Sequence, residues 1–205
     1  AVGEVWHPPP VNIAKAVVLL LLAASSAACA STIDWDYSKE VDPRKTEYVI
    51  GAADGLQINV WQNGDLSTQA IVRPDGTITM PLVGDLKVGG KTPTQVRNEI
   101  KARLAEFVKA EAAIVTVAVT AVNSYRFTVT GSVQNPGTFN SQYYVSLADA
   151  LAMAGGPTRF ADTSAIEVIR PNGDNGKSRR IPVSYDDIQT RRRPAANIIL
   201  IAGDN

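Results

Sequence analysis

The side chains best suited to nucleophilic or metal chemistry lie within the first 29 residues. The sequence holds a single cysteine, Cys29, and a single histidine, His7. One thiol and one imidazole are too few for the usual His/Cys zinc sites, and a disulfide within the chain is impossible. Cys29 follows small residues at the end of an apolar run. The nature of that run therefore decides what Cys29 does.

The apolar run spans residues 16–30, whereas a membrane-spanning helix needs roughly 20 mostly apolar residues. One preceding basic residue, a Val/Leu-rich middle and a small-residue end are typical of a bacterial secretory signal. The end resembles the lipobox of bacterial lipoproteins, although Ser26 stands where those boxes usually carry Leu. This resemblance implies a signal peptide over residues 1–28, lipidation of Cys29 and, with Ala30 after it, transfer to the outer membrane. Plain secretion and a buried apolar helix are the alternatives.

Processing at Cys29 would remove His7 and leave a chain with no histidine and no unmodified thiol. A Ser-His-Asp or Cys-His catalytic arrangement could not then be assembled. No paired Asp/Glu constellation stands out from turns and solvated helix faces. We therefore expect no enzyme, no cofactor and no metal site.

The formal net charge is zero, and it stays zero when Glu4, His7 and Lys15 leave with the signal. No global basic field points to nucleic acid. Two local basic clusters stand apart, which are Lys177, Arg179 and Arg180, and Arg191, Arg192 and Arg193. Each cluster is either a solvated face or a site for an anionic partner, namely a lipid headgroup, an acidic polymer or a protein.

A polar, charged and aperiodic stretch follows the signal, and we expect residues 29–46 to be a membrane-proximal tether. Leu56, Ile58 and Val60 then alternate with polar residues, which predicts a half-buried strand. The next two apolar runs flank Pro74-Asp75-Gly76. Because proline presets a turn and Gly76 can adopt positive φ, we predict that these runs pair as a hairpin.

A helix is predicted to begin after Thr92, with Pro93 in its first turn and Gln95 completing a capping box. Its apolar face repeats at helical spacing, through Val96, Ile100, Leu104 and Val108. Strand alternation returns over 113–119. Residues 47–122 are thus expected to form a small sheet covered by one helix.

Residues 123–205 predict a second unit that begins with strands at 125–131 and 138–144 around the turn Asn135-Pro136-Gly137. Ser146 and Asp149 form a second capping box, and Gly155-Gly156 ends that helix. Further strands are predicted at 165–170, 179–183 and 197–201. Hairpin, helix and further strands are the order of a β-grasp, so the fold class is α+β. The residues assigned to structural turns are Asp75, Gly76, Pro136, Gly137, Gly155 and Gly156.

Three stretches, 48–61, 71–92 and 129–158, resemble the bacterial outer-membrane polysaccharide export family. The first two resemble its polysaccharide export domain and the third its soluble-ligand-binding β-grasp (SLBB) domain. Two features depart from the family. Ala53 lies where members commonly have the second glycine of G-x-G-D, and the sequence stops at the Gly203-Asp204 turn, where members usually go on to a further strand and long members to an amphipathic helix that crosses the outer membrane. We expect either a truncated chain or a short member whose outer-membrane pore comes from another protein.

The resemblance implies a lipid-anchored protein that faces the periplasm from the outer membrane and assembles into a ring. Polysaccharide would be its cargo, and its β-grasp domain would face an inner-membrane polysaccharide copolymerase and tyrosine kinase. Two alternatives stay open: a monomeric periplasmic sugar-binding lipoprotein, and an adaptor that uses its Arg-rich loops. Trp61, Tyr143 and Tyr144 could stack on sugar rings or pack in a core or interface.

Overall fold

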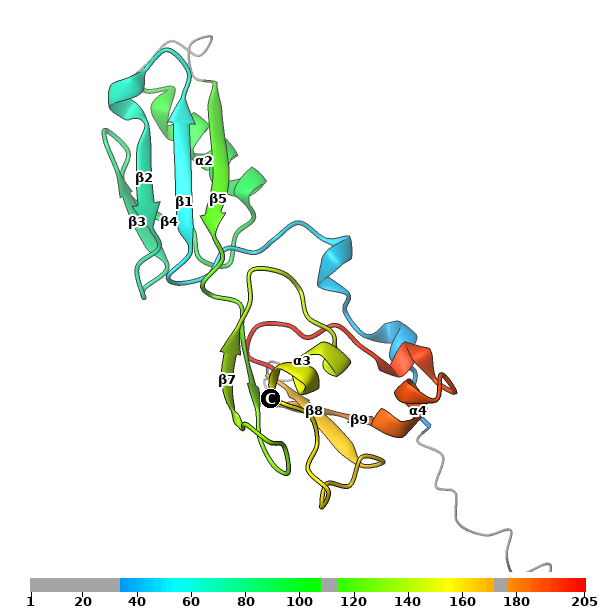
Figure 1. The fold of residues 1–205 in the computed structure, drawn as a ribbon. Coiled ribbons are helices and arrows are strands. Elements are labelled where there is room, and N and C mark those ends of the chain that lie inside the picture. The colour runs from blue at the N-terminus through cyan, green and yellow to red at the C-terminus, as the bar shows by residue number, and fades with distance from the viewer. Residues whose placement is uncertain (1–33, 108–113, 172–176) are drawn as a thin grey trace, which may run out of the picture. The chain divides into compact units, whose positions relative to one another are not determined.

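The computed structural model describes residues 34–107, 114–171 and 177–205, and Trp35–Asn205 form one compact unit (Figure 1). Sheets and helices are both present, which confirms the predicted α+β class. Buried apolar side chains form two clusters, one between Ile50 and Val115 and the other between Tyr125 and Leu200. We call the corresponding parts of the chain the first domain and the second domain. No helix among the described residues is long and apolar enough to cross a membrane.

The first domain is built around an antiparallel sheet with the strand order β2-β1-β5. The strands of this domain are β1 (Gly55–Val60), β2 (Thr68–Ile71), β3 (Thr77–Met80), β4 (Gly84–Lys87) and β5 (Val115–Ala121), with the short helix η4 (Gly64–Leu66) between β1 and β2. Of these, β3 and β4 form a separate two-stranded sheet. Leu56, Ile58 and Val60 are buried, whereas Asn59 is exposed. The predicted alternation of β1 is therefore confirmed, because successive side chains of a strand point to opposite faces.

The predicted hairpin across Pro74-Asp75-Gly76 is wrong. β2 pairs with β1, and β3 pairs instead with β4. Val72 N–H donates to the carbonyl of Asp54 (2.9 Å), which holds the end of β2 beside β1. The Gly76 carbonyl accepts from Val88 and Gly89 (2.9 and 2.8 Å), so the turn is tied to the chain after β4. These contacts compete successfully with the local turn preference.

Helix α2 (Pro93–Leu104) begins at the predicted cap, with both hydrogen bonds of the Thr92–Gln95 capping box formed. Val96, Ile100 and Leu104 are fully buried, while Val108 lies outside the described residues. Figure 1 shows α2 behind the sheet. Burying each of these apolar side chains contributes about 1.5–3 kcal/mol, which makes this face the main reason the helix is stable.

The second domain has the predicted order of hairpin, helix and further strands, and two of these further strands pair as a second hairpin. Its elements are β6 (Arg126–Val129), β7 (Gly137–Asn140), α3 (Leu147–Met153), β8 (Ile166–Arg170), β9 (Arg179–Val183), α4 (Tyr185–Gln189) and η6 (Pro194–Ala196). β6 pairs with β7, and β8 pairs with β9. The strand predicted over 197–201 is not formed: that segment runs beside the start of α3 and makes one isolated bridge, between Ile199 and Ser146.

The described part of the segment that was expected to be a membrane-proximal tether packs against the protein. It forms the short helices η2 (Tyr37–Lys39) and η3 (Pro43–Lys45). Trp35 and Tyr37 pack against the apolar cluster of the second domain, and the Tyr37 hydroxyl donates to the carbonyl of Pro182 (2.7 Å). We call residues 35–40 the strap. Its aromatic residues explain the packing, because they bury area that a solvated linker would expose.

Candidate functional site

The predicted turn residues lie at two separate places, and Cys29 and His7 lie outside the described residues. Asp75 accepts from the backbone N–H of Thr77 (3.0 Å) in the turn before β3, and Gly76 has a φ of 77°. Positive φ is the conformation that glycine adopts without steric cost. These two residues make a turn and no visible binding site.

The remaining predicted turn residues are brought together beside the end of α3. Gly155 and Gly156 have φ of 78° and 84°, and the Gly156 N–H donates to the Leu151 carbonyl (2.8 Å). The Gly156 carbonyl accepts from Gln134, in the loop that leads to Pro136 and Gly137. A Cβ at Gly155 would lie 2.7 Å from Asn135 Nδ2. The helix end and the turn therefore pack closely as a structural unit.

Asp54, at the start of β1, is completely buried. Its carboxylate accepts from the backbone N–H groups of Gly51, Asn123 and Ser124, each at 2.8 Å. It also accepts from the hydroxyls of Tyr48 (2.6 Å) and Ser124 (2.9 Å). Such a dense set of donors stabilises a buried carboxylate without a cation. The network joins the chain before β1 to the segment that follows β5.

Burial, followed by the hydrogen bond to Asp54, raises the pKa of the Tyr48 hydroxyl well above its ordinary value. The phenol therefore remains a hydrogen-bond donor over the physiological pH range. Burial also raises the pKa of Tyr125, whose hydroxyl donates to the Leu200 carbonyl (3.1 Å). Both tyrosines thus serve as fixed donors.

The turn from Gly51 to Asp54 uses a residue that the family resemblance flagged. Ala53 has a φ of 72°, in the left-handed region that costs an alanine roughly 1–2 kcal/mol. Its N–H donates to the Val72 carbonyl (2.8 Å), which helps to hold this conformation. The turn therefore forms without the glycine, but Ala53 adopts a strained backbone conformation.

A second turn of the same form ends at Asp204. The carboxylate of Asp204 accepts from the N–H of Ile201 (2.8 Å), as Asp54 does from Gly51, and Gly203 has a φ of 89°. Here the main partner is a cation, because Arg170 donates from Nε (3.1 Å) and Nη2 (2.8 Å). Asp204 is 1% exposed and Arg170 6%. A buried ion pair of this kind needs complete pairing to be tolerated.

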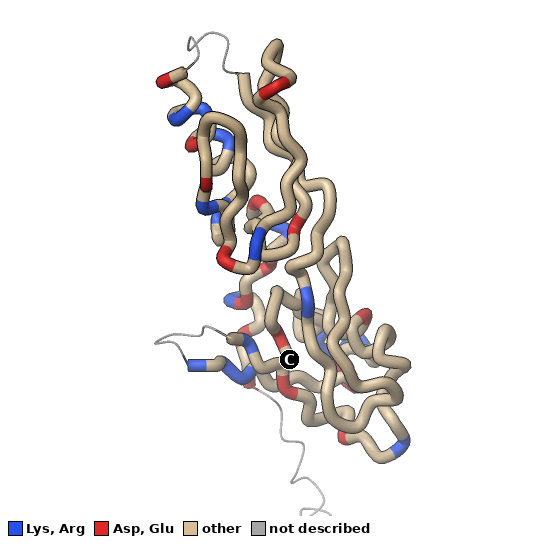
Figure 2. The backbone as a smooth tube through the Cα atoms, turned by 90° about the vertical axis from the view of Figure 1, so that its left-hand side faces the viewer, with Lys and Arg blue, Asp and Glu red and all other residues tan. Residues whose placement is uncertain are grey.

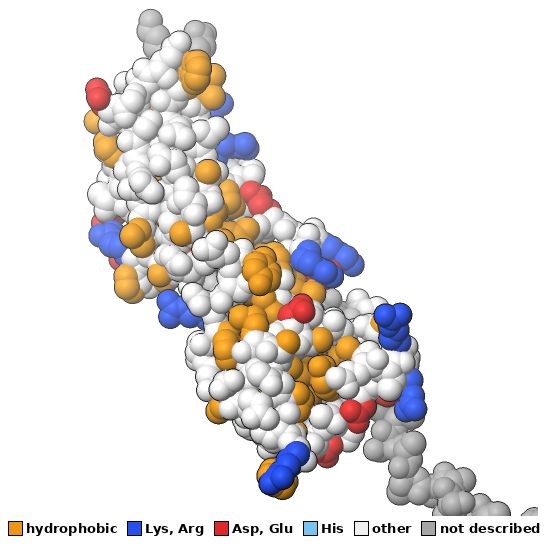
Figure 3. All heavy atoms as spheres, viewed as in Figure 1, with side chains coloured by type: hydrophobic (Ala, Val, Ile, Leu, Met, Phe, Trp, Pro, Cys, Tyr) orange, Lys and Arg blue, Asp and Glu red, His pale blue; other side chains and the backbone are white. Residues whose placement is uncertain are grey.

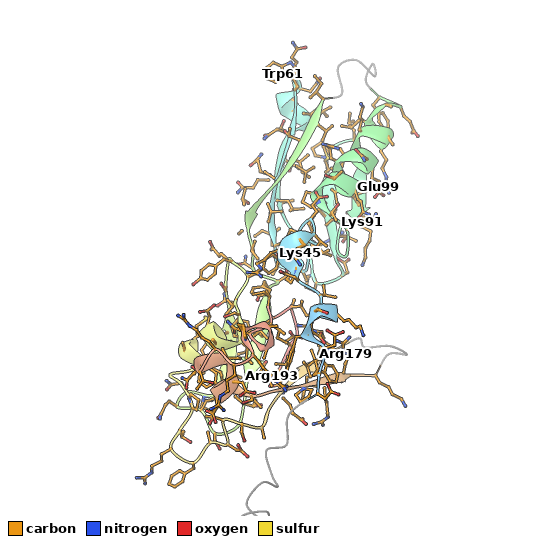
Figure 4. All side chains as sticks on the ribbon, turned by 90° about the vertical axis from the view of Figure 1, so that its right-hand side faces the viewer. Lys45, Trp61, Lys91, Glu99, Arg179 and Arg193 are labelled. Carbon is orange, nitrogen blue, oxygen red and sulfur yellow. The ribbon has the colours of Figure 1, made fainter. Side chains whose placement is uncertain are left out.

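Arg170 also binds the strap. Its Nη1 lies 3.3 Å from Glu40, whose side chain is 4% exposed. Arg179 forms an ion pair with the same carboxylate, and Trp35 Nε1 donates to it (2.9 Å). Figure 4 labels Arg179 in this region. The strap is thus attached to β8 by a buried ion pair, to β9 by the partly exposed Arg179, and to both by apolar contacts.

Sequence reasoning did not single out Glu40, Arg170 or the buried role of Asp54. A signal for Arg170 was present: it follows Ile166 and Val168 at the inward spacing of β8, where an arginine must find an acid. Nothing in the polar run around Glu40 distinguishes it from its exposed neighbours. All three charged groups act structurally, since their oxygens and nitrogens already bind protein groups.

The aromatic residues considered for sugar stacking differ in exposure. Trp61 and Tyr143 are 62% and 73% exposed, and Figure 4 shows Trp61 at the end of the first domain. Tyr144 packs edge-on against Tyr125, with ring centroids 5.4 Å apart. Tyr144 therefore belongs to the second core, while Trp61 and Tyr143 remain available for contact.

Over the described ranges, no three His, Cys, Asp or Glu residues come together in a way that could hold a metal ion. Buried side-chain polar atoms there all have partners. The described residues also line an open hollow of about 1110 Å³, whose lining includes Tyr48, Tyr125 and Tyr144. Figure 3 shows apolar side chains gathered on the visible face of the second domain, with basic side chains at its margin.

Two protein-family models match consecutive parts of the chain. Residues 42–120 match the model described as polysaccharide biosynthesis/export protein, and residues 126–182 match the SLBB domain. The matches cover the first domain and most of the second in this order.

Curated proteins similar to the chain carry related names. The EPS I polysaccharide export outer membrane protein EpsA of Ralstonia nicotianae is 34% identical over 176 residues, which are 85% of this chain and 43% of that protein. The capsule polysaccharide export protein BexD of Haemophilus influenzae is 32% identical over 65% of this chain and 32% of its own length. The capsule polysaccharide export outer membrane protein CtrA of Neisseria meningitidis is 31% identical over 66% and 33%. The chain thus spans less than half the length of these relatives.

Proposed function

Because the chain belongs to the polysaccharide biosynthesis/export family and carries an SLBB domain after its export domain, we propose that it is a component of a bacterial polysaccharide export machine. In this proposal it forms an oligomeric ring that lets capsular or extracellular polysaccharide pass. The observation that carries the proposal is the match of both domains, in order, together with relatives named as polysaccharide export outer membrane proteins.

The first domain supports self-association. β2 and β5 are the outer strands of its sheet, and within the described residues each pairs with β1 alone. β5 contains no charged residue and no proline, which are the usual means of protecting an edge strand. A contact between different faces of neighbouring copies closes into a ring when the rotation permits.

The proposed location is the periplasmic face of the outer membrane, with a lipid on Cys29. Other proposed partners are an inner-membrane polysaccharide copolymerase with its tyrosine kinase, and a separate outer-membrane pore protein. A conduit for a hydrated polymer requires positioning and a polar wall, so the proposal includes no catalytic step. The variant Cys29→Ser is expected to lose the membrane fractionation that resists high salt, and unchanged fractionation at high salt together with an unlipidated mass of the parent protein would contradict lipid anchoring.

The experiment that tests the function is deletion of the gene, followed by assay of surface polysaccharide. We expect surface polymer to disappear while precursor accumulates, and a plasmid copy to restore it. A normal amount of surface polymer in the deletion strain would contradict export.

Native mass spectrometry of the detergent-extracted protein tests the ring separately. A closed oligomer supports the proposal. A strict monomer with measurable affinity for short oligosaccharides would instead support the sugar-binding lipoprotein.

A further inference from the structure

The starting point is where the chain enters the second domain. The strap begins at Trp35, whose indole is tied to Glu40, and Glu40 is buried against Arg170. Tyr37 is tied to Pro182 in β9. Only five residues separate Cys29 from Trp35 in the sequence. At about 3.5 Å per residue, that stretch reaches no more than roughly 21 Å. A lipid on Cys29 therefore keeps the entry point close to the membrane surface.

Both basic clusters of the sequence flank this entry point. We call them together the basic rim, which comprises Lys177, Arg179, Arg180, Arg191, Arg192 and Arg193. Arg179 lies over the Trp35 ring, 5.6 Å from its centroid. Arg193 directly precedes η6, and η6 contacts η2 of the strap. Figure 4 labels Arg179 and Arg193, and Figure 2 marks the basic positions after the grey loop between β8 and β9 in blue.

The rim contains charge that the protein does not neutralise. Arg179 is paired with Glu40 and Arg180 with Glu167. In the part of the chain that the structure describes, Lys177, Arg191 and Arg192 are exposed and make no ion pair. Asp186 and Asp187 lie in the first turn of α4, and Asp34 and Asp36 are exposed at the entry point, so these acids reduce the charge of the region. Lys177, Arg191 and Arg192 are the rim cations that no ion pair of the described chain neutralises.

We propose that the basic rim is a membrane-contact surface that binds the phosphate groups of anionic lipids beside the lipid anchor. Each basic side chain near an anionic membrane adds roughly a tenfold or smaller factor to binding, and the attraction acts only within a Debye length of about 8 Å. The stretch from Cys29 to Trp35 spans at most roughly 21 Å, so it lets the rim come within a Debye length of the membrane. The proposal rests on the lipid anchoring in the proposed function.

The proposal changes one expectation about orientation. With the rim on the membrane that holds the anchor, the second domain lies at the outer membrane and does not face the inner-membrane copolymerase. The rim then determines the orientation of the protein relative to the membrane.

The test uses the processed chain from residue 29 with Cys29→Ser, so that binding does not depend on the lipid. Co-sedimentation compares vesicles of phosphatidylcholine alone with vesicles that also contain one third phosphatidylglycerol. We expect binding to the anionic vesicles only, lost at high salt. The double variant Arg191→Gln/Arg192→Gln is expected to bind about 30-fold more weakly.

The matched control is Arg97→Gln/Lys101→Gln, which removes two exposed basic residues of α2. It should bind as the parent does. Equal losses in both variants, or no preference for anionic vesicles, would overturn the proposal. So would rim variants that lose retention on an acidic polysaccharide resin while vesicle binding is unchanged, because the surface would then bind polymer. The vesicle result does not depend on export, so it distinguishes this failure from failure of the proposed function.

Discussion

Two turns of one backbone form bury their aspartates with different partners. Asp54 is held by three backbone N–H groups and two hydroxyls, all from neutral groups. Asp204 is held chiefly by the guanidinium of Arg170. The first arrangement ties the start of β1 to the segment after β5, whereas the second reaches the strap through Glu40. The difference shows that neutral donors can hold one buried carboxylate, whereas a shared cation holds two carboxylates from separate segments.

The largest loss of stability is expected when Arg170 is replaced. Arg170→Ala would leave the buried carboxylate of Asp204 without its cation and remove one of the two cations at Glu40, and we expect a loss of about 3–5 kcal/mol in the free energy of unfolding. Urea denaturation of the processed chain measures it. Arg180→Ala removes an exposed arginine with a single ion pair to Glu167 and should cost no more than about 1 kcal/mol. Similar losses in the two variants would show that the buried network is unimportant.

Removing the neutral-donor carboxylate should cost less. Asp54→Ala would leave the N–H groups of Gly51, Asn123 and Ser124 without their acceptor, and we expect a loss of about 3 kcal/mol. The exposed Asp65→Ala in the same domain is the control and should change stability by about 0.5 kcal/mol or less. A larger loss in the free energy of unfolding for Asp54→Ala than for Arg170→Ala would contradict this ranking of the two networks.

Substitutions of the residue before each aspartate should change stability in opposite directions. Gly203→Ala should destabilise by about 1–2 kcal/mol, because φ is 89° there and a Cβ would lie 3.0 Å from Pro171 Cγ. Gly64→Ala, with nothing within 4 Å of the added Cβ, is its control. Ala53→Gly should stabilise by about 0.5–1 kcal/mol through relief of the left-handed strain. Thermal unfolding of the three variants would test this, and a destabilised Ala53→Gly protein would contradict it.

The smallest effect concerns pH. The folded-state pKa of Tyr48 is raised above the ordinary value of 10.0, so its contribution is complete below that pH and is lost as the pH rises through the folded pKa. Stability should therefore fall more steeply in the parent than in Tyr48→Phe above about pH 10. Urea midpoints at pH 9 and 11 measure this difference. Parallel pH curves would show that Tyr48 is not the group responsible.

The sequence predicted the elements that local chemistry decides. Both capping boxes, at Thr92 and Ser146, are formed as predicted, because each depends on residues three positions apart. The hairpin around Asp75 was predicted wrongly, since the partners of β2 and β3 are chosen by distant strands. The strand predicted near Ile199 failed for the same reason.

The buried charges could be predicted only in part. Arg170 lies at an inward-facing position of β8, which predicts that an acidic residue lies nearby. The alternation of the strand does not identify which acidic residue it is. Glu40 is recognisable only once the strap has been seen to pack. Conversely, the sequence showed that alanine replaces the expected glycine at position 53. The structure shows that Ala53 adopts a positive φ there.

Arg170 joins two acids that stand 130 and 34 residues away from it along the chain. A polypeptide that emerges N-terminus first from a ribosome or a secretion channel presents Glu40 long before its counter-charge exists. The strap can therefore settle only after most of the protein has emerged, and closing so long a loop slows that step. Until then Glu40 has no arginine to pair with, and the strap stays unattached.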